Sequence, residues 1–246
     1  MVTLASRKEQ NVLWLIWQDP KTRLRHVVGK LWLNDNDSCE FAYQKNGFRV
    51  AESKGFRVLP SLPDCNMTYQ SSKLFSVFAR RLPDKRRPDY QKILEGYGLP
   101  PESSEFDILA KTGGKLATDN FEFVTSLESC SNLPFKHELF LAGWKYWGGA
   151  IGIPPEELIP GTILKIIPEP ENQFDKFALQ VFTTAGKKIG YVPSFYSNLV
   201  SHYIADGCNC YLEVLGFNST EESSNVLKLK LVCDGKCPKR REILVH

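Results

Sequence analysis

Short runs rich in apolar residues predict strands near the start of the chain. The clearest runs cover residues 12–18, 24–33 and 39–43, and turn-forming residues separate them. Asn46-Gly47, after the third run, is a dipeptide typical of hairpin turns. An irregular, proline-containing stretch is expected over residues 57–70. We therefore expect a small antiparallel sheet in this part of the chain.

Helical periodicity replaces the strand pattern farther along. Short helices are predicted over residues 73–81, 89–95 and 105–112. Ser72 and Ser104 are the expected N-caps of the first and third helices, because a serine hydroxyl can accept a hydrogen bond from a free backbone N–H. Residues 116–127 return to a strand pattern. Strands followed by short helices predict an α+β domain.

A β-hairpin is predicted in the second half of the chain. Two short apolar runs, residues 178–183 and 188–192, flank the tight turn Ala185-Gly186. Asn172 and Asp175 lie at the open end of the hairpin, where short polar side chains can hold the turn backbone.

Three motifs in this half resemble the HIRAN domain. They are Asn172-x-x-Asp175-x-x-Ala178-x-x-Val181, Ile189-Gly190-Tyr191-Val192-Pro193, and the expected opening strand Leu141-Ala142-Gly143-Trp144-Lys145-Tyr146. The resemblance extends over about residues 135–232. It implies a small OB-like β-barrel with one or two short helices, and capture of the 3′ end of single-stranded DNA.

The same resemblance implies a set of DNA-binding residues. The family's arginine–tyrosine pair corresponds to Lys145-Tyr146, and its tyrosine–aspartate pair to Phe174-Asp175. An aromatic ring would stack on a base, and Asp175 would accept the proton of a terminal 3′-hydroxyl. The implied set is Lys145, Tyr146, Asn172, Phe174, Asp175, Tyr191 and Ser194.

The chain departs from the family pattern at two positions. Ser194 stands where a basic residue is expected, and Leu227 where an aromatic residue is expected on the last strand. An alternative remains open, in which Tyr146, Phe174 and Asp175 only hold the barrel together and Asp175 caps the turn backbone.

The first half resembles the N-terminal subdomain of HipA-type serine/threonine kinases. The motifs are Val28-Gly29-Lys30-Leu31, Phe41-x-Tyr43, Leu59-Pro60-Ser61-Leu62-Pro63, Phe75-x-x-Phe78-x-x-Arg81-Leu82-Pro83-Asp84 and Phe106-Asp107-Ile108-Leu109. No glycine-rich loop, His-Arg-Asp or Asp-Phe-Gly motif of a kinase core follows. Such a subdomain also exists as a separate HipS-like protein, which restrains the kinase in split toxin–antitoxin systems. The resemblance therefore implies a HipA-like kinase as partner.

Apolar residues beside a cluster of cations are the predicted partner-binding surface. The candidates are Phe75, Phe78, Arg81, Arg86 and Arg87. Further apolar anchors are expected in the irregular stretch from residue 56 to 69. The run Lys85-Arg86-Arg87 can grip phosphates or an acidic partner. The alternative is a solvated loop between helices.

Composition narrows the functional classes. The net charge of +3 is too small for a broad nucleic-acid-binding face, so DNA binding would use a local pocket. Seven cysteines and the absence of a secretion-type start favour a reducing cytoplasm. Cys208, Cys210, Cys233 and Cys237 allow a zinc site, but cysteines in apolar strands are usually core residues.

These patterns together predict a two-domain, non-catalytic binding protein. Residues 1–134 form the HipA-like domain and residues 135–246 the HIRAN-like domain. We expect single-stranded DNA-end recognition by the second domain, docking of a HipA-like kinase by the first, and no cofactor. The alternative is an antitoxin-type regulator that acts through protein contact alone, with a barrel that no longer binds DNA.

Overall fold

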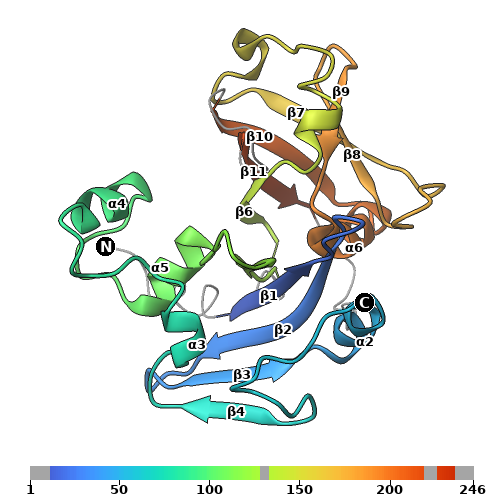
Figure 1. Cartoon of the computed structure of the whole chain (residues 1–246). Coiled ribbons are helices and arrows are strands. Elements are labelled where there is room, and N and C mark those ends of the chain that lie inside the picture. The colour runs from blue at the N-terminus through green and yellow to red at the C-terminus, as the bar shows by residue number, and fades with distance from the viewer. Residues whose placement is uncertain (1–11, 128–132, 219–225, 236–246) are drawn as a thin grey trace. The chain divides into compact units, whose positions relative to one another are not determined.

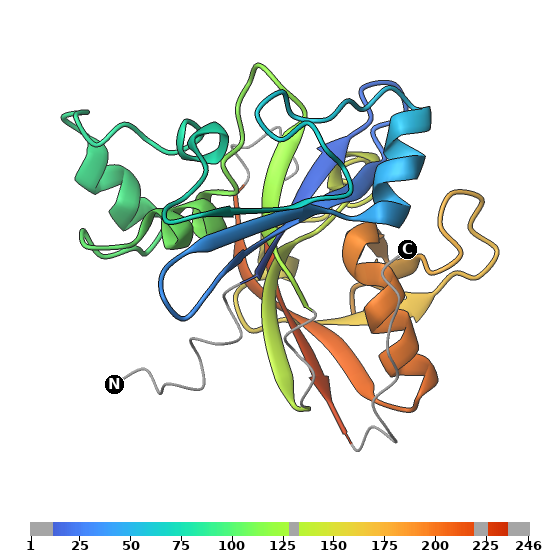
Figure 2. The same ribbon diagram turned by 90° about the horizontal axis from the view of Figure 1, so that it is seen from below.

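The computed structural model describes residues 12–127, 133–218 and 226–235. The chain divides into two compact units, Met1–Ser129 and Cys130–His246, called unit 1 and unit 2 below. Figures 1 and 2 show the elements of each unit from two directions. Among the described residues, no helix is long and apolar enough to cross a membrane.

Unit 1 is built on a five-stranded antiparallel sheet. Its strands are β1 (Val12–Gln18), β2 (Arg25–Leu33), β3 (Cys39–Tyr43), β4 (Thr68–Ser71) and β5 (Phe121–Thr125), in the order β4-β3-β2-β1-β5. The predicted β1, β2 and β3 are confirmed, with β2 one residue shorter. The predicted strand over 116–127 is shorter than expected and pairs with β1, far away in the sequence. Aromatic and aliphatic side chains of the sheet, such as Phe41 and Phe123, form the core with the helices.

The predicted turn at Asn46-Gly47 is wrong, because both residues belong to α2 (Lys45–Ser53). Gly47 is explained by packing against β2, since a Cβ atom there would lie 1.9 Å from the carbonyl oxygen of Val27. Figure 2 shows α2 beside the sheet. A glycine needed for close approach and a glycine needed for a turn look alike in the sequence.

The other helices of unit 1 are α3 (Ser76–Ala79), α4 (Tyr90–Gly96) and α5 (Glu105–Thr112). The predicted cap of α5 is confirmed, because the Ser104 hydroxyl oxygen accepts a hydrogen bond from the backbone N–H of Asp107 at 3.1 Å. The first helix is shorter than predicted: it follows Phe75 as N-cap, without a side-chain cap, and Ser72 lies outside it. Helical spacing of apolar residues therefore overstated its length.

Unit 2 is a curled six-stranded antiparallel sheet, a half-barrel with few helices. Its strands are β6 (Phe135–Phe140), β7 (Ile163–Pro168), β8 (Leu179–Phe182), β9 (Lys188–Tyr191), β10 (Asn209–Phe217) and β11 (Leu227–Asp234), in the order β6-β11-β10-β7-β8-β9. Its helices are the 3-10 turns η1 (Trp144–Tyr146) and η2 (Pro155–Leu158), and α6 (Ser194–Ala205). The predicted β8–β9 hairpin is confirmed.

The two outer strands of this sheet meet through one bridge. Ala142, just after β6, and Tyr191 of β9 exchange both backbone hydrogen bonds at 2.9 Å. Leu139, Leu164, Val181 and Leu212 are among the buried side chains that fill the interior of the curl. The curl therefore carries the segment after β6 to the open edge of β9.

Candidate functional site

The Lys145-Tyr146 pair lies on the 3-10 turn η1, and not on an opening strand as predicted. The strand ends at Phe140, and Gly143 then redirects the chain with a φ of 76°, a left-handed conformation that favours glycine. A Cβ atom at Gly190 would lie 2.4 Å from the carbonyl oxygen of Ala142, so the close approach of this segment to β9 needs glycine there. The backbone thus holds η1 at the edge of the hairpin.

Two aromatic side chains of the predicted DNA set are open to solvent. Tyr146 is 75% exposed and Phe174 is 78% exposed. Lys145 is also exposed. In contrast, Trp144 packs its ring 5.2 Å from that of Phe217, which anchors η1 beneath the exposed pair. Because an exposed aromatic ring can stack on a base, Tyr146 and Phe174 are both candidates for DNA contact.

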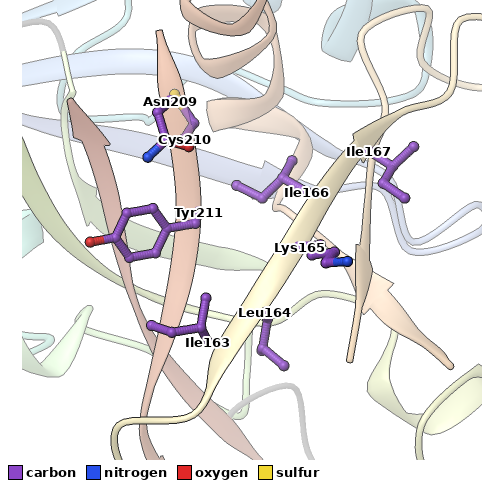
Figure 3. Close-up of a pocket in the computed structure, with 8 residues that line it drawn as sticks. All are labelled: Ile163, Leu164, Lys165, Ile166, Ile167, Asn209, Cys210 and Tyr211. Atoms are coloured by element: carbon purple, nitrogen blue, oxygen red, sulfur yellow. The ribbon is translucent and has the colours of Figure 1, made fainter. Parts of the chain in front are cut away.

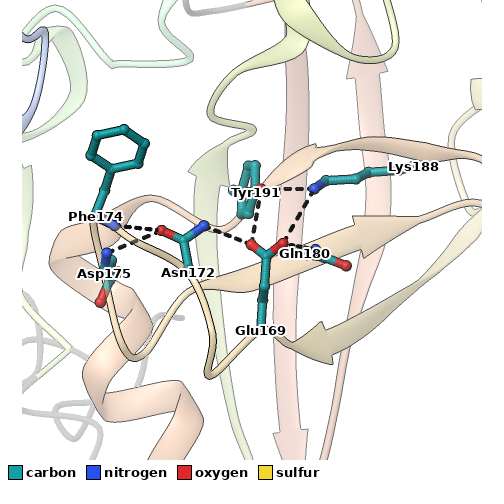
Figure 4. A network of polar contacts seen from close by, with 7 residues as sticks. All are labelled: Glu169, Asn172, Phe174, Asp175, Gln180, Lys188 and Tyr191. Carbon is teal, nitrogen blue, oxygen red and sulfur yellow. Dashed lines mark hydrogen bonds and ion pairs between the residues drawn. The ribbon is translucent and has the colours of Figure 1, made fainter.

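The loop between β7 and β8 is held by side-chain caps, as Figure 4 shows. The Oδ1 atom of Asn172 accepts hydrogen bonds from the backbone N–H groups of Phe174 (3.0 Å) and Asp175 (3.1 Å). The Asp175 carboxylate accepts from the backbone N–H of Phe177 at 2.9 Å and from the Ser197 hydroxyl at 2.7 Å. Asn172 and Asp175 therefore fix the loop that displays Phe174, which is the capping role left open by the sequence.

Glu169 is the centre of a polar network that sequence reasoning missed. Its carboxylate accepts hydrogen bonds from the Asn172 side-chain amide at 2.6 Å, the Tyr191 hydroxyl at 3.0 Å and the Gln180 amide. The hydrogen bond from Asn172, followed by that from Tyr191 and the charge of Lys188, lowers the pKa of Glu169 below its ordinary value. One feature of the sequence could have indicated this network: the alternation of side chains along the hairpin places Gln180 and Tyr191 on its outward face.

Lys188 is tied into the same network and is not an available phosphate ligand. Its Nζ atom donates a hydrogen bond to the Tyr191 hydroxyl at 2.7 Å and lies 3.9 Å from the Glu169 carboxylate. It also lies 3.7 Å from the centre of the Trp147 ring and 4.3 Å from that of Tyr191, a cation–π arrangement. Because Trp147 directly follows η1, Lys188 connects that turn to the network.

The two positions that depart from the family pattern differ in their surroundings. Ser194 is exposed and begins α6, where its carbonyl oxygen lies 2.8 Å from the Ser197 hydroxyl as a second possible acceptor besides Asp175. Leu227 is 0% exposed and belongs to the core of unit 2. Leu227 therefore offers no stacking surface.

Two members of the predicted partner-binding set lie inside unit 1. Phe78 is 1% exposed, and its ring lies 4.9 Å from that of Phe123. The guanidinium of Arg81 pairs with both carboxylate oxygens of Asp119 at 2.6 and 2.7 Å, and its side chain is 7% exposed. Both residues hold the fold together. Phe75 is half-buried and remains partly open at the surface.

The cationic run Lys85-Arg86-Arg87 is paired locally. Arg86 contacts Asp84 at 2.7 Å, Arg87 contacts Asp89 at 2.8 Å, and Lys85 contacts Glu105 at 3.3 Å. The hydrogen bonds from Arg86 lower the pKa of Asp84 to about 2. These acidic partners offset the positive charge, which weakens the phosphate-grip interpretation and leaves exposed, polar side chains suited to the rim of an interface.

The cysteines of the zinc alternative that the structure describes lie on or beside β10 and β11. Cys210 on β10 pairs in register with Cys233 on β11, and Cys208 is buried just before β10. Cys237 lies outside the described residues. Within those residues, no three His, Cys, Asp or Glu side chains gather as metal ligands would.

Comparison with known proteins finds two separate family matches, one in each half of the chain. A family model described as the HipA N-terminal domain matches residues 24–117, and one described as the HIRAN domain matches residues 135–231. No curated protein sequence matches the chain. A crystal structure of the HIRAN domain of human HLTF is similar with 13% identity and a TM-score of 0.33, covering 40% of this chain and 74% of that one. A crystal structure of a Lactobacillus plantarum protein has 20% identity and a TM-score of 0.34, covering 41% and 96%.

Proposed function

Since the chain fuses a HipA N-terminal domain to a HIRAN domain, we propose that it is a non-catalytic binding protein with two binding surfaces. Unit 2 captures the 3′ end of single-stranded DNA, and unit 1 docks a HipA-like kinase. The HIRAN match supports DNA binding in general. The preference for a 3′ end is the finer part of the proposal.

The observation that carries the DNA proposal is the display of Tyr146 and Phe174. Both rings are about three-quarters exposed, yet the backbones beneath them are held by hydrogen bonds. Each ring can stack on one base, which contributes about 1–3 kcal/mol. Lys145 lies beside Tyr146 and supplies a point charge for a phosphate.

Asp175 accounts for recognition of the end itself. One carboxylate oxygen accepts from Phe177 and the other from Ser197. An ionised carboxylate has roughly four acceptor sites, so lone pairs remain for a terminal 3′-hydroxyl. A 3′-phosphate would place negative charge beside this carboxylate and be repelled. Capping the loop and reading the end are therefore compatible roles of one side chain.

The test is a fluorescence titration with oligonucleotides that end in a 3′-hydroxyl or a 3′-phosphate. Tighter binding of the hydroxyl end is expected, with a shallow salt dependence because few phosphates are contacted. Tyr146→Ala should weaken binding about 5- to 150-fold, whereas Tyr97→Ala, which removes an exposed tyrosine of unit 1, should not. Asp175→Asn should reduce the ratio of the two affinities. Equal affinity for both ends in the wild type would refute end recognition.

Unit 1 keeps exposed apolar side chains suited to a protein partner. Met67, in the irregular stretch before β4, is 52% exposed, and Phe75 is partly exposed. Arg86 and Arg87 lie on the loop that follows α3, where their exposed, locally paired charges can add polar contacts to the same partner. Phe78 and Arg81 support this surface from within and do not contact the partner directly.

Docking is tested by co-purifying the full chain with a HipA-like kinase and measuring the activity of that kinase with and without the chain. Met67→Glu should weaken the complex, and charge reversal at Arg86 and Arg87 should slow association more than it speeds dissociation. Val50→Glu, at a similarly exposed position of unit 1, is the control. Inhibition of the kinase without any DNA binding would favour the alternative, an antitoxin that acts through protein contact alone. The departures from the HIRAN pattern at Ser194 and Leu227 support that alternative.

A further inference from the structure

Cations and aromatic rings alternate in a row across four strands of unit 2. Lys188 of β9 pairs with Phe182 of β8, Phe182 pairs with Lys165 of β7, and Lys165 pairs with Tyr211 of β10. Side chains of directly paired residues lie on the same face of a sheet. The burial pattern shows that this is the outward face, since Leu164, Val181 and Leu212, next to members of the row, are fully buried.

The middle of the row is open to solvent. Lys165 is exposed, and its neighbours on the same face of β7, Ile163 and Ile167, are each 43% exposed. Phe182 and Tyr211 are half-buried, so their rings are supported and also reachable. Adjacent strands lie about 4.8 Å apart, so the backbones that carry the two aromatic residues are about 10 Å apart.

A shallow groove of about 530 Å³ runs beside this row. The groove lies along β7 near Lys165. At this residue β7 stops pairing with β10, and from there on β7 pairs with β8 alone. Figure 3 shows the residues of the two strands that line it. These are Ile163, Leu164, Lys165, Ile166, Ile167, Asn209, Cys210 and Tyr211. Apolar walls with one lysine suit a ligand that has flat apolar surfaces and negative charge.

The acidic groups on this face are already neutralised. Glu213 pairs with Lys230 at 2.8 Å, and Glu169 is held by Lys188 and three hydrogen bonds. Within the described residues, the side-chain ammonium group of Lys165 has no hydrogen-bond or ion-pair partner. An anionic ligand would therefore meet a local positive charge, although unit 2 as a whole is close to neutral.

We propose that this row is a second nucleic-acid subsite, which binds the single strand beyond its captured end. Phe182 and Tyr211 would stack on bases and Lys165 would contact a phosphate between them, the combination that sequence-tolerant single-strand binders use. The subsite is continuous with the end site, because Ile167 pairs with Gln180 and Gln180 pairs with Tyr191 of the Glu169 network. This inference rests on the proposed function and adds a preference for longer strands.

The experiment measures affinity against length, with oligothymidines of about 3 to 12 nucleotides, because one OB-type fold covers about 4–16 nucleotides. For the wild type, affinity should rise with length and then level off. Tyr211→Leu, which keeps the apolar bulk, should reduce the affinity for the longest strand about 5- to 150-fold, the factor for one stacked base, and leave the shortest unchanged. Lys165→Gln should act in the same direction. Lys187→Gln, a lysine of the hairpin turn paired with Glu157, is the matched control.

The outcomes separate the subsite from the end site. A preference for 3′-hydroxyl ends with no length dependence would overturn the subsite and leave the proposed function standing. Length dependence that Tyr211→Leu and Lys165→Gln both abolish, without any preference between ends, would support the subsite and refute end recognition. Equal reductions at every length in both variants would mean that the row only supports the fold, and would overturn the proposal.

Discussion

Replacing Glu169 by alanine should release the loop that displays Phe174. Glu169 anchors the side-chain amide of Asn172, and the carbonyl oxygen of that amide caps the backbone N–H groups of Phe174 and Asp175. In Glu169→Ala the Asn172 amide can rotate, so the caps are kept for a smaller fraction of the time. The ring of Phe174 would then be presented by a mobile loop, and ordering that loop would cost free energy when DNA binds.

The size of this effect follows from the hydrogen bonds that the substitution removes. Hydrogen bonds to a charged group contribute about 1.5–3 kcal/mol each when buried. The Glu169 side chain is 27% exposed, so water can partly replace it as an acceptor. We therefore expect the loop to open about 1–3 kcal/mol more easily, which corresponds to roughly 5- to 150-fold faster exchange of its protected amides.

Hydrogen exchange of the full-length protein, read out on peptides that cover residues 169–180, is the appropriate assay. Glu171→Ala removes an exposed carboxylate two residues away and provides the control. Affinity for a DNA end should fall in Glu169→Ala and stay the same in Glu171→Ala. Unchanged protection of the Phe174 and Asp175 amides in Glu169→Ala would contradict the anchoring role of Glu169, because it would show that Asn172 caps the loop without its anchor.

Three further results are expected. Arg81→Ala should lower the free energy of unfolding of unit 1 by about 3–5 kcal/mol, because it leaves Asp119 without its buried partner. The measurement is urea-induced unfolding, monitored by hydrogen exchange of unit 1, and a decrease below about 1 kcal/mol would contradict the prediction. Gly47→Ala should cost about 1–3 kcal/mol or more, since its Cβ would overlap the Val27 carbonyl, and unaltered α2 protection would contradict that. The pKa of Glu169 is lowered from 4.5, so the stability that Glu169 gives to the loop at residues 169–180 should be complete above pH 4.5 and be lost as the pH falls through the lower pKa of the folded state. Hydrogen-exchange protection of these residues that stays constant on acidification would contradict this.

Local patterns predicted several features of the candidate site. The β8–β9 hairpin follows from alternation and the Ala185-Gly186 turn, and the capping role of Asn172 and Asp175 follows from their position at its mouth. Ser104 as the cap of α5 follows for the same reason. These features depend on residues only a few positions apart, so the sequence contains the whole interaction.

Long-range pairing decided the remainder. Nothing near Lys188 in the sequence shows that Trp147 covers its charge together with Tyr191, and nothing near Arg81 shows that Asp119 lies opposite. The cluster at residues 85–87 is different, because Asp84 and Asp89 pair with Arg86 and Arg87 from two residues away, and only Glu105, the partner of Lys85, is distant in the sequence.

The two family resemblances, most of the strand and helix types, and the candidate pair Tyr146 and Phe174 can be read from the sequence. The folded structure is needed to show which polar groups are satisfied internally and which face solvent. The physical reason is that burial and ion pairing depend on what the fold places opposite a side chain, and partners such as Asp119 for Arg81 and Trp147 for Lys188 come from segments far apart in the chain. The row from Lys188 to Tyr211 exists only because β9, β8, β7 and β10 pair in register.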